Sequence, residues 1–137
     1  MGLILASSVV IAAERRGDTP EQLVQQVIGV AGNQEAALSS VGLTELVHGI
    51  YRANSAQVRT RRRSFVDELR IGLTVYPYTA ETALLAGRID GEQTAAGVVV
   101  PFVDLLIGAT ALSLGFSIQT VNMRHFNKIP GLNVIPT

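Results

Sequence analysis

The sequence predicts a three-layer α/β/α sandwich built around a mostly parallel sheet of four or five strands. Short apolar runs, bounded by glycine, proline or polar turn residues, alternate with longer segments of helical periodicity. Strands separated by helices pair in parallel, because each crossover helix returns the chain to the same end of the sheet. The 137 residues contain no linker rich in proline, glycine or serine, so we expect one domain over residues 1–137.

Short apolar segments carry the strand pattern. Runs of branched apolar residues between turn signals are typical of strands buried on both faces of a parallel sheet. Gly42 follows the second run and Pro77 closes the third. The expected strands are Leu3–Leu5, Ala36–Val41, Leu73–Tyr76, Ser117–Thr120 and Asn133–Ile135.

Capping residues mark the helices between these strands. Thr19, Pro20 and Gln22 combine a cap, a proline at the first helical position and a capping-box partner at the third. Ser7 and Ser8 can cap the first helix through their hydroxyls. We expect helices up to Arg16, from Pro20, from near Thr44, over Arg59–Leu69, from Thr79 to near Gln93 and over Val103–Leu114. Their inward stripes are Leu23, Val24, Val27 and Ile28, then Leu46, Val47 and Ile50, then Phe65, Val66 and Leu69.

Composition excludes several classes of protein. Hydrophobic residues make up 47% of the chain and charged residues 16%, which favours a packed core over disorder. Eleven basic residues balance eleven acidic ones, so any attraction to nucleic acid must be local. The chain has no cysteine, which excludes a disulfide scaffold, a thiolate zinc site and a cysteine nucleophile.

Membrane insertion and export are not expected. The most apolar stretch, Val98–Phe116, is interrupted by Pro101 and Asp104, and a bilayer span needs about 20 apolar residues. Met1–Ala13 is apolar but lacks the positively charged leader of an export signal. We therefore expect a cytoplasmic protein.

Two acidic residues fall where a parallel sheet gathers its functional groups, beyond the carboxyl ends of the strands. Asp104 is the one charged residue between Gln93 and Met123 and opens an apolar helix, and Glu45 is expected in the first turn of the helix after the second strand. Each alone is explained by the common role of an acid that caps a helix or stabilises its dipole. Together they are the hard oxygen ligands that Mg²⁺ or Mn²⁺ requires, and these ions activate water for phosphodiester cleavage.

The segment Thr120–Phe126 follows the fourth strand at the same edge. Asn122 can supply a neutral oxygen ligand, Arg124 a phosphate contact and His125 a proton donor or acceptor. The alternative interpretation is a simple loop in which the asparagine accommodates the turn and Phe126 anchors the segment to the core.

Basic residues suggest where RNA could bind. Arg59–Arg63, with Arg52 shortly before it, is the densest basic cluster, and it is interpreted either as a grip on an RNA backbone or as a solvated helix face. Arg15, Arg16 and Arg124 lie nearer the expected site and are the stronger candidates for RNA contacts.

Four segments, in this order, resemble a known family. They are Leu5–Ile11, Leu43–Leu46, Pro101–Ala111 and Thr120–Phe126, and Ile129–Leu132 adds a fifth match. The sequence is similar to PIN domains over essentially its whole length and, more narrowly, to the VapC-type toxins of bacterial toxin–antitoxin pairs. The resemblance implies a Mg²⁺- or Mn²⁺-dependent endoribonuclease that cuts structured RNA.

The resemblance also implies roles for particular residues and partners. Glu45, Asp104 and Asn122 match three of the positions that form the family's acidic metal pocket. A VapB-type antitoxin is expected to lay an amphipathic helix across the toxin, with a basic residue reaching the pocket. The apolar stripes of 13–30 and 47–51 could receive that helix or could form a homodimer face.

Ala6 departs from the family pattern, which has Leu-Asp-Ser/Thr-Ser-Val where this chain has Leu5-Ala6-Ser7-Ser8-Val9. A methyl group cannot bind a metal, and affinity for hard cations depends strongly on the number of carboxylates. We therefore expect weak metal binding and little or no cleavage, whether the alanine was introduced deliberately or is natural.

Two other functions remain open at this point. A non-catalytic module that binds an antitoxin or RNA without cutting is separated from the nuclease by metal-dependent cleavage. A phospho-acceptor receiver domain is disfavoured, because no aspartate closes the third strand and the one lysine, Lys128, lies beyond the fourth.

Overall fold

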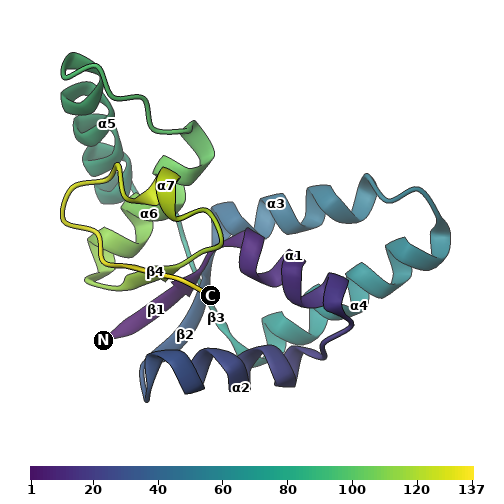
Figure 1. The fold of residues 1–137 in the computed structure, drawn as a ribbon. Coiled ribbons are helices and arrows are strands. Elements are labelled where there is room, and N and C mark those ends of the chain that lie inside the picture. The colour runs from purple at the N-terminus through teal and green to yellow at the C-terminus, as the bar shows by residue number, and fades with distance from the viewer.

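A five-stranded parallel sheet with the strand order β3-β2-β1-β4-β5 lies between two layers of helices in the computed structural model, which describes residues 1–137 (Figure 1). The strands are Gly2–Leu5 (β1), Glu35–Ser39 (β2), Thr74–Tyr76 (β3), Ser117–Gln119 (β4) and Val134–Ile135 (β5). The helices are Ser7–Arg16 (α1), Pro20–Ala31 (α2), Ser40–Tyr51 (α3), Ala56–Gly72 (α4), Ala80–Ala95 (α5), Phe102–Leu114 (α6) and Met123–Phe126 (α7). The predicted sandwich is confirmed.

The alternation of side chains along β1 creates two cores. Leu3 and Leu5 pack on one face of the sheet with α1, α2, α3 and α4, whereas Ile4 packs on the other face with α5 and α6. All three side chains are fully buried or nearly so. A central strand that is apolar on both faces is what a parallel sheet covered by helices on each side requires.

The strand register brings the carboxyl ends of β2, β1 and β4 to one edge. Ile4 of β1 is paired with Ala37 of β2 and with Ile118 of β4, and all three strands run in the same direction. The helices α1 and α3 begin immediately after β1 and β2, so both start at this edge and run away from it. Figure 1 shows α3 and α4 extending together beyond the sheet as an arm.

Local capping signals fix several helix starts as predicted. The backbone N–H of Gln22 donates to Thr19 Oγ1 at 3.1 Å, and the Thr19 N–H donates to Gln22 Oε1 at 2.8 Å, which completes the capping box of α2. Thr79 caps α5 by accepting from the Thr82 N–H. Each such cap satisfies backbone donors that the helix itself leaves unpaired.

The expected cap of α1 and the expected starts of the third and fourth helices are wrong. The fourth helix begins at Ala56 rather than Arg59, because Ser55 caps it by accepting from the Val58 N–H at 3.1 Å. No side chain caps α1, because Ala6 occupies the N-cap position and Ser7 directs its hydroxyl elsewhere. The third helix begins at Ser40 rather than near Thr44, since Ser39 ends β2 and accepts from the Gly42 N–H at 2.9 Å. This cap shortens the expected second strand by two residues.

The inward stripes are mostly confirmed. Leu23 and Val27 of α2, and the three apolar residues expected of α4, are buried, as are Leu46 and Ile50 of α3. Val47 and Ile28 are the exceptions, with 38% and 41% of their surfaces exposed. The segment after β4, for which a simple loop was the alternative interpretation, contains the short helix α7, whose last residue, Phe126, is buried. None of the helices combines the length and the apolar character needed to cross a membrane.

Candidate active site

Three chain segments meet at the carboxyl edge of the sheet, around Ala6. This residue joins β1 to α1 and is only 3% exposed. Its backbone N–H donates to the carbonyl oxygen of Gln119 at 3.0 Å, which ties the end of β1 to the end of β4. Ala6 is therefore central to this edge and shielded from solvent, and it has a methyl group where the resemblance to PIN domains predicts an acid.

Glu45 lies on the first of the two helices that flank this position. It stands in the second turn of α3, one turn later than expected, because the helix starts at Ser40. Its Oε1 accepts a hydrogen bond of 2.6 Å from the hydroxyl of Ser7. The serine expected to cap α1 instead orients a half-buried carboxylate 38 residues away.

Asp104 enters from the other side of the sheet. It lies in the first turn of α6, where a carboxylate is stabilised by the helix dipole, but its side chain does not cap the helix. Its Oδ2 is 2.7 Å from Nδ1 of His125, which α7 contributes. The Asp104 side chain is 19% exposed and the His125 side chain 39%, so both are accessible from solvent.

Asn122 sits where β4 gives way to α7. It is exposed, and its side chain does not cap α7. Its backbone N–H donates to Thr120 Oγ1 at 2.9 Å, and the Val121 N–H donates to Ser8 Oγ at 3.3 Å. These bonds attach the segment after β4 to the start of α1, so it borders the same edge as Ala6.

The residues at this edge do not fit a tightly held divalent cation. No three His, Asp or Glu side chains anywhere in the fold come together as a metal-binding group. Glu45 and Asp104 each have a protein partner, and Ala6, where the resemblance predicts a third acid, has no side-chain oxygen. Mg²⁺ and Mn²⁺ are held by several oxygen ligands and depend on their charge, so two separate carboxylates make a weak site.

The basic residues expected to contact RNA are differently placed. Arg15 lines an open depression together with Glu45, whereas Arg16 turns toward α2 and donates to Asp18 at 2.8 Å. Arg124 lies on α7 within a second, shallow hollow that also includes Asn122 and His125. Of the expected contacts, Arg16 is the one that is already neutralised by a carboxylate.

The basic cluster at the start of α4 is partly structural. Arg61 pairs with the buried Glu14 at 3.0 Å. Arg63 donates to Tyr51 Oη at 2.9 Å and lies over the tyrosine ring. This hydrogen bond and, after it, the positive charge of Arg63 lower the pKa of Tyr51, because both favour tyrosinate. Arg62 joins the depression next to Glu45, a placement that no pattern in the sequence indicated.

Comparison with known proteins agrees with this fold. A family model described as "PIN domain" matches residues 3–132. Ribonuclease VapC1 of Rickettsia felis is 30% identical over 135 residues, which are 98% of this chain and 96% of that protein. The tRNA(fMet)-specific endonuclease VapC of Salmonella typhimurium is 31% identical over 97 residues, 71% of each chain.

Solved structures share the same fold. A chain in the crystal structure of VapBC2 from Rickettsia felis, bound to a DNA fragment from the promoter, superimposes with a TM-score of 0.86 at 23% identity and covers 100% of this chain and 99% of that one. The present chain therefore belongs to the PIN domain family and, within it, to the VapC-type toxins of VapBC toxin–antitoxin systems.

Proposed function

We propose that this chain is a VapC-type endoribonuclease whose site at the carboxyl edge lacks one of its carboxylates, so that the chain as it stands binds RNA but cuts it slowly or not at all. The observation that carries the proposal is the buried methyl group of Ala6 at the junction of β1 and α1. The residues on both sides of Ala6 resemble the family pattern. Two relatives that this chain matches over nearly their whole length are named ribonucleases.

The proposed metal is Mg²⁺ or Mn²⁺, as the family resemblance implies. Glu45 and Asp104 would be its charged ligands, and Asn122 would add a neutral oxygen. An aspartate at position 6 would raise the number of carboxylates from two to three. Because affinity for a hard cation rises with ligand charge, we expect this one change to have a large effect on binding.

The proposed substrate is a structured RNA. The Salmonella typhimurium relative is named for tRNA(fMet), which makes transfer RNA the natural first substrate to test. Arg15, Arg124 and His125 would contact phosphates beside the two acids, since Arg15 shares a depression with Glu45, and Arg124 and His125 share a hollow with Asn122. Arg16 would have to leave Asp18 before it could do so.

The proposed partner is a VapB-type antitoxin, since the structurally similar VapBC2 chain comes from a toxin–antitoxin complex. An apolar groove of about 100 Å³ between α1, α3 and α4 fits the side chains of an amphipathic helix. Its apolar lining residues are Val10, Ile11, Leu46, Phe65 and Val66, and the remaining lining residues are Glu14, Arg15, Gly49 and Arg62. We also propose that residues 1–137 act as one domain in the cytoplasm, paired as a homodimer.

The alternative is a binding module that captures an antitoxin or RNA without catalysis, and the same alanine favours it. Cleavage of total RNA by the parent and by Ala6→Asp, with Mg²⁺, with Mn²⁺ and with EDTA, separates the two. We expect only Ala6→Asp to cut, and EDTA to stop it. Ala6→Asn is the matched control, because it has the same size without the charge. If neither Ala6→Asp nor the parent cuts, the nuclease proposal fails and the binding module replaces it.

A further inference from the structure

An open depression of about 660 Å³ runs between α1 and α3, starting at the hydrogen bond between Ser7 and Glu45. One face of each helix lines it. α1 contributes Ser7, Ile11 and Arg15, α3 contributes Glu45 and His48, and Arg52 follows directly after the end of α3. These positions are three or four residues apart, which places each set along a single side of its helix.

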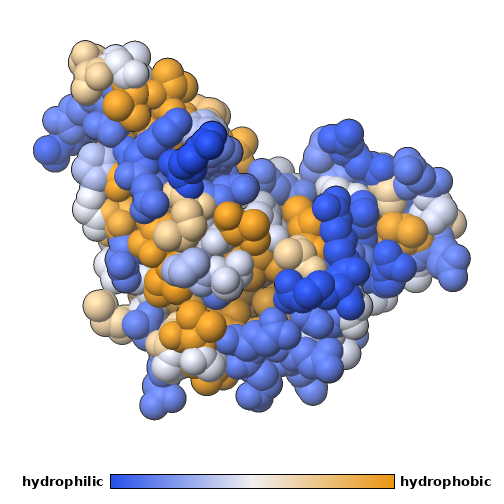
Figure 2. Space-filling model, in the orientation of Figure 1, coloured by the Kyte–Doolittle hydropathy of each residue, from blue (hydrophilic) through white to orange (hydrophobic).

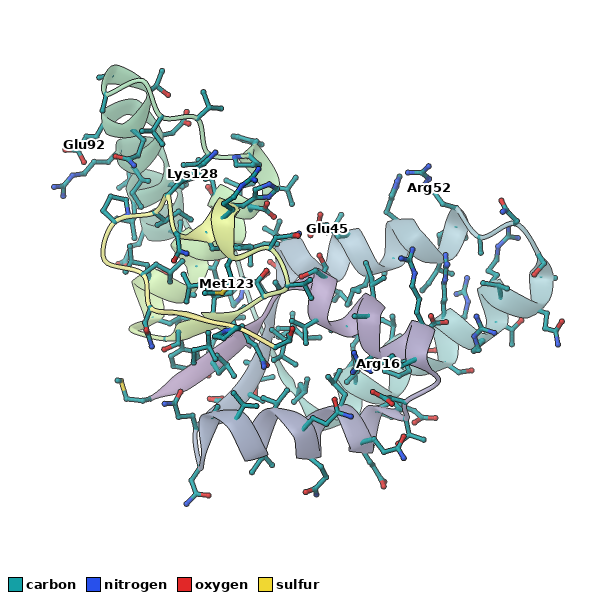
Figure 3. The ribbon with its side chains drawn as sticks, in the orientation of Figure 1. Arg16, Glu45, Arg52, Glu92, Met123 and Lys128 are labelled. Atoms are coloured by element: carbon teal, nitrogen blue, oxygen red, sulfur yellow. The ribbon has the colours of Figure 1, made fainter.

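The depression leads outward from the candidate active site. α1 and α3 both begin at the carboxyl edge of the sheet, so the space between them opens away from that edge. Arg52 follows Glu45 by seven residues, which is two turns and a rise of about 10 Å. Figure 3 shows Glu45 near the start of α3 and Arg52 near its far end. In Figure 2 much of the surface over the α3–α4 arm, at the right, is strongly hydrophilic.

Three arginines in the depression carry uncompensated charge. No carboxylate oxygen lies within 4.0 Å of the side chains of Arg15, Arg52 or Arg62. Arg62 reaches across from α4 and donates to the carbonyl oxygen of Gly49 at 2.7 Å. That contact holds the guanidinium at the depression and leaves its other N–H groups free to bind an acceptor.

The net charge of the whole chain is zero, so this concentration of positive charge is a local feature. Guanidinium groups match the geometry of phosphate oxygens and bind them through charge-assisted hydrogen bonds. An apolar helix is a poor fit, because Ile11 and Val103 are the main apolar side chains in the lining. The chemistry of the depression therefore favours a phosphate backbone.

We propose that this depression holds the RNA strand on one side of the bond to be cut, with Arg15, Arg52 and Arg62 on successive phosphates. The proposal rests on the assignment of the carboxyl edge as a ribonuclease site and adds the path of the substrate. It predicts that the strand leaves the site along α3 toward the α3–α4 arm. Arg52 and Arg62 are thereby positioning residues for the substrate, remote from the reacting atoms.

The test measures binding of fluorescein-labelled unfractionated transfer RNA to the full chain by fluorescence anisotropy over a range of salt concentrations. The parent chain suits this experiment, because we expect it to leave the RNA intact. Arg15→Ala and Arg52→Ala each remove an exposed side chain. The logarithm of the association constant falls linearly with the logarithm of the salt concentration, and each lost phosphate contact makes this slope less steep by about 0.7. At 0.1 M salt this corresponds to about fivefold weaker binding.

Arg70→Ala is the matched control, because this exposed arginine in the last turn of α4 also lacks a carboxylate partner but lies outside the depression. We expect it to bind like the parent, and the double variant Arg15→Ala/Arg52→Ala to bind about 25-fold more weakly if the two contacts are independent. Far-UV circular dichroism confirms that each variant is folded.

The outcomes separate this proposal from the proposed nuclease activity. Arginine-dependent binding supports the substrate path even if Ala6→Asp fails to cut. Equal losses in Arg70→Ala, or no binding of transfer RNA by the parent, overturn the path even if Ala6→Asp is an active nuclease. A polyglutamate chain that binds as tightly, with the same dependence on Arg15 and Arg52, would assign the depression to an acidic protein segment and refute the RNA path.

Discussion

Replacing Ala6 with aspartate is expected to make the stability of the fold depend on divalent cations. The position is 3% exposed, so a carboxylate there loses most of its hydration. A buried polar group without a partner costs about 1–3 kcal/mol and a charged one costs more, so we expect Ala6→Asp in EDTA to lose at least about 2 kcal/mol of unfolding free energy. A cation at about 100 times its dissociation constant contributes about 2.7 kcal/mol to the folded state and would offset that loss.

The assay is urea unfolding followed by far-UV circular dichroism, since the chain has no tryptophan to report by fluorescence. Curves are compared in EDTA and in saturating Mg²⁺ for the parent, Ala6→Asp and Ala6→Asn. The asparagine variant carries the same packing cost without the charge, so Mg²⁺ should leave it unchanged. An equal response of both variants to Mg²⁺, or no response in Ala6→Asp, would refute the assignment of this position to a metal site.

Three further substitutions test other parts of the structure. Ser7→Ala removes the hydroxyl that donates to the Glu45 carboxylate, and we expect it to lower the free energy of unfolding in urea by about 1 kcal/mol. In the Ala6→Asp background we also expect slower RNA cleavage. If stability and cleavage rate are both unchanged, this hydrogen bond does not orient the carboxylate. Gly108→Ala would bring a methyl group against the side chain of Ile129, and we expect it to lower the free energy of unfolding by about 1–3 kcal/mol in the same assay. An unchanged stability would contradict this close packing of α6. The pKa of Tyr76 is raised, because the Glu35 carboxylate accepts a hydrogen bond from the tyrosine hydroxyl and disfavours tyrosinate. Glu35→Gln should therefore lower the pKa of Tyr76 toward its ordinary value in an ultraviolet pH titration. A pKa that stays raised would contradict this cause.

Much of the fold could be predicted because its signals are local. The capping box at Thr19 involves residues three apart, and the apolar run of β1 needs no knowledge of its partners. The predicted start of α3 is too late because Val41 continues the apolar pattern and Gly42 is the more conspicuous turn signal, while the cap at Ser39 that ends the strand is equally local but less conspicuous. A serine hydroxyl can cap a helix, stabilise a turn or form a hydrogen bond with a residue distant in sequence. Which of these partners it binds depends on the competition between them in the folded chain.

The site was only partly accessible to sequence reasoning. The rule that functional groups lie beyond the carboxyl ends of parallel strands brought Glu45 and Asp104 to one edge, where the structure has them. The bond from Ser7 to Glu45 spans 38 residues, and the contact between Arg62 and Gly49 depends on how α4 packs back onto α3. No spacing pattern encodes such contacts, because they depend on the tertiary arrangement.

The central claim is that the carboxyl edge is a ribonuclease site disabled by one missing carboxylate. The most direct measurement is the rate of transfer RNA cleavage in Mg²⁺ by the parent, Ala6→Asp, Ala6→Asp/Glu45→Gln and Ala6→Asp/Asp104→Asn, purified in parallel. We predict that Ala6→Asp alone cuts and that each second substitution returns the rate to that of the parent. Equal cleavage by all four chains, or by none, would contradict the claim.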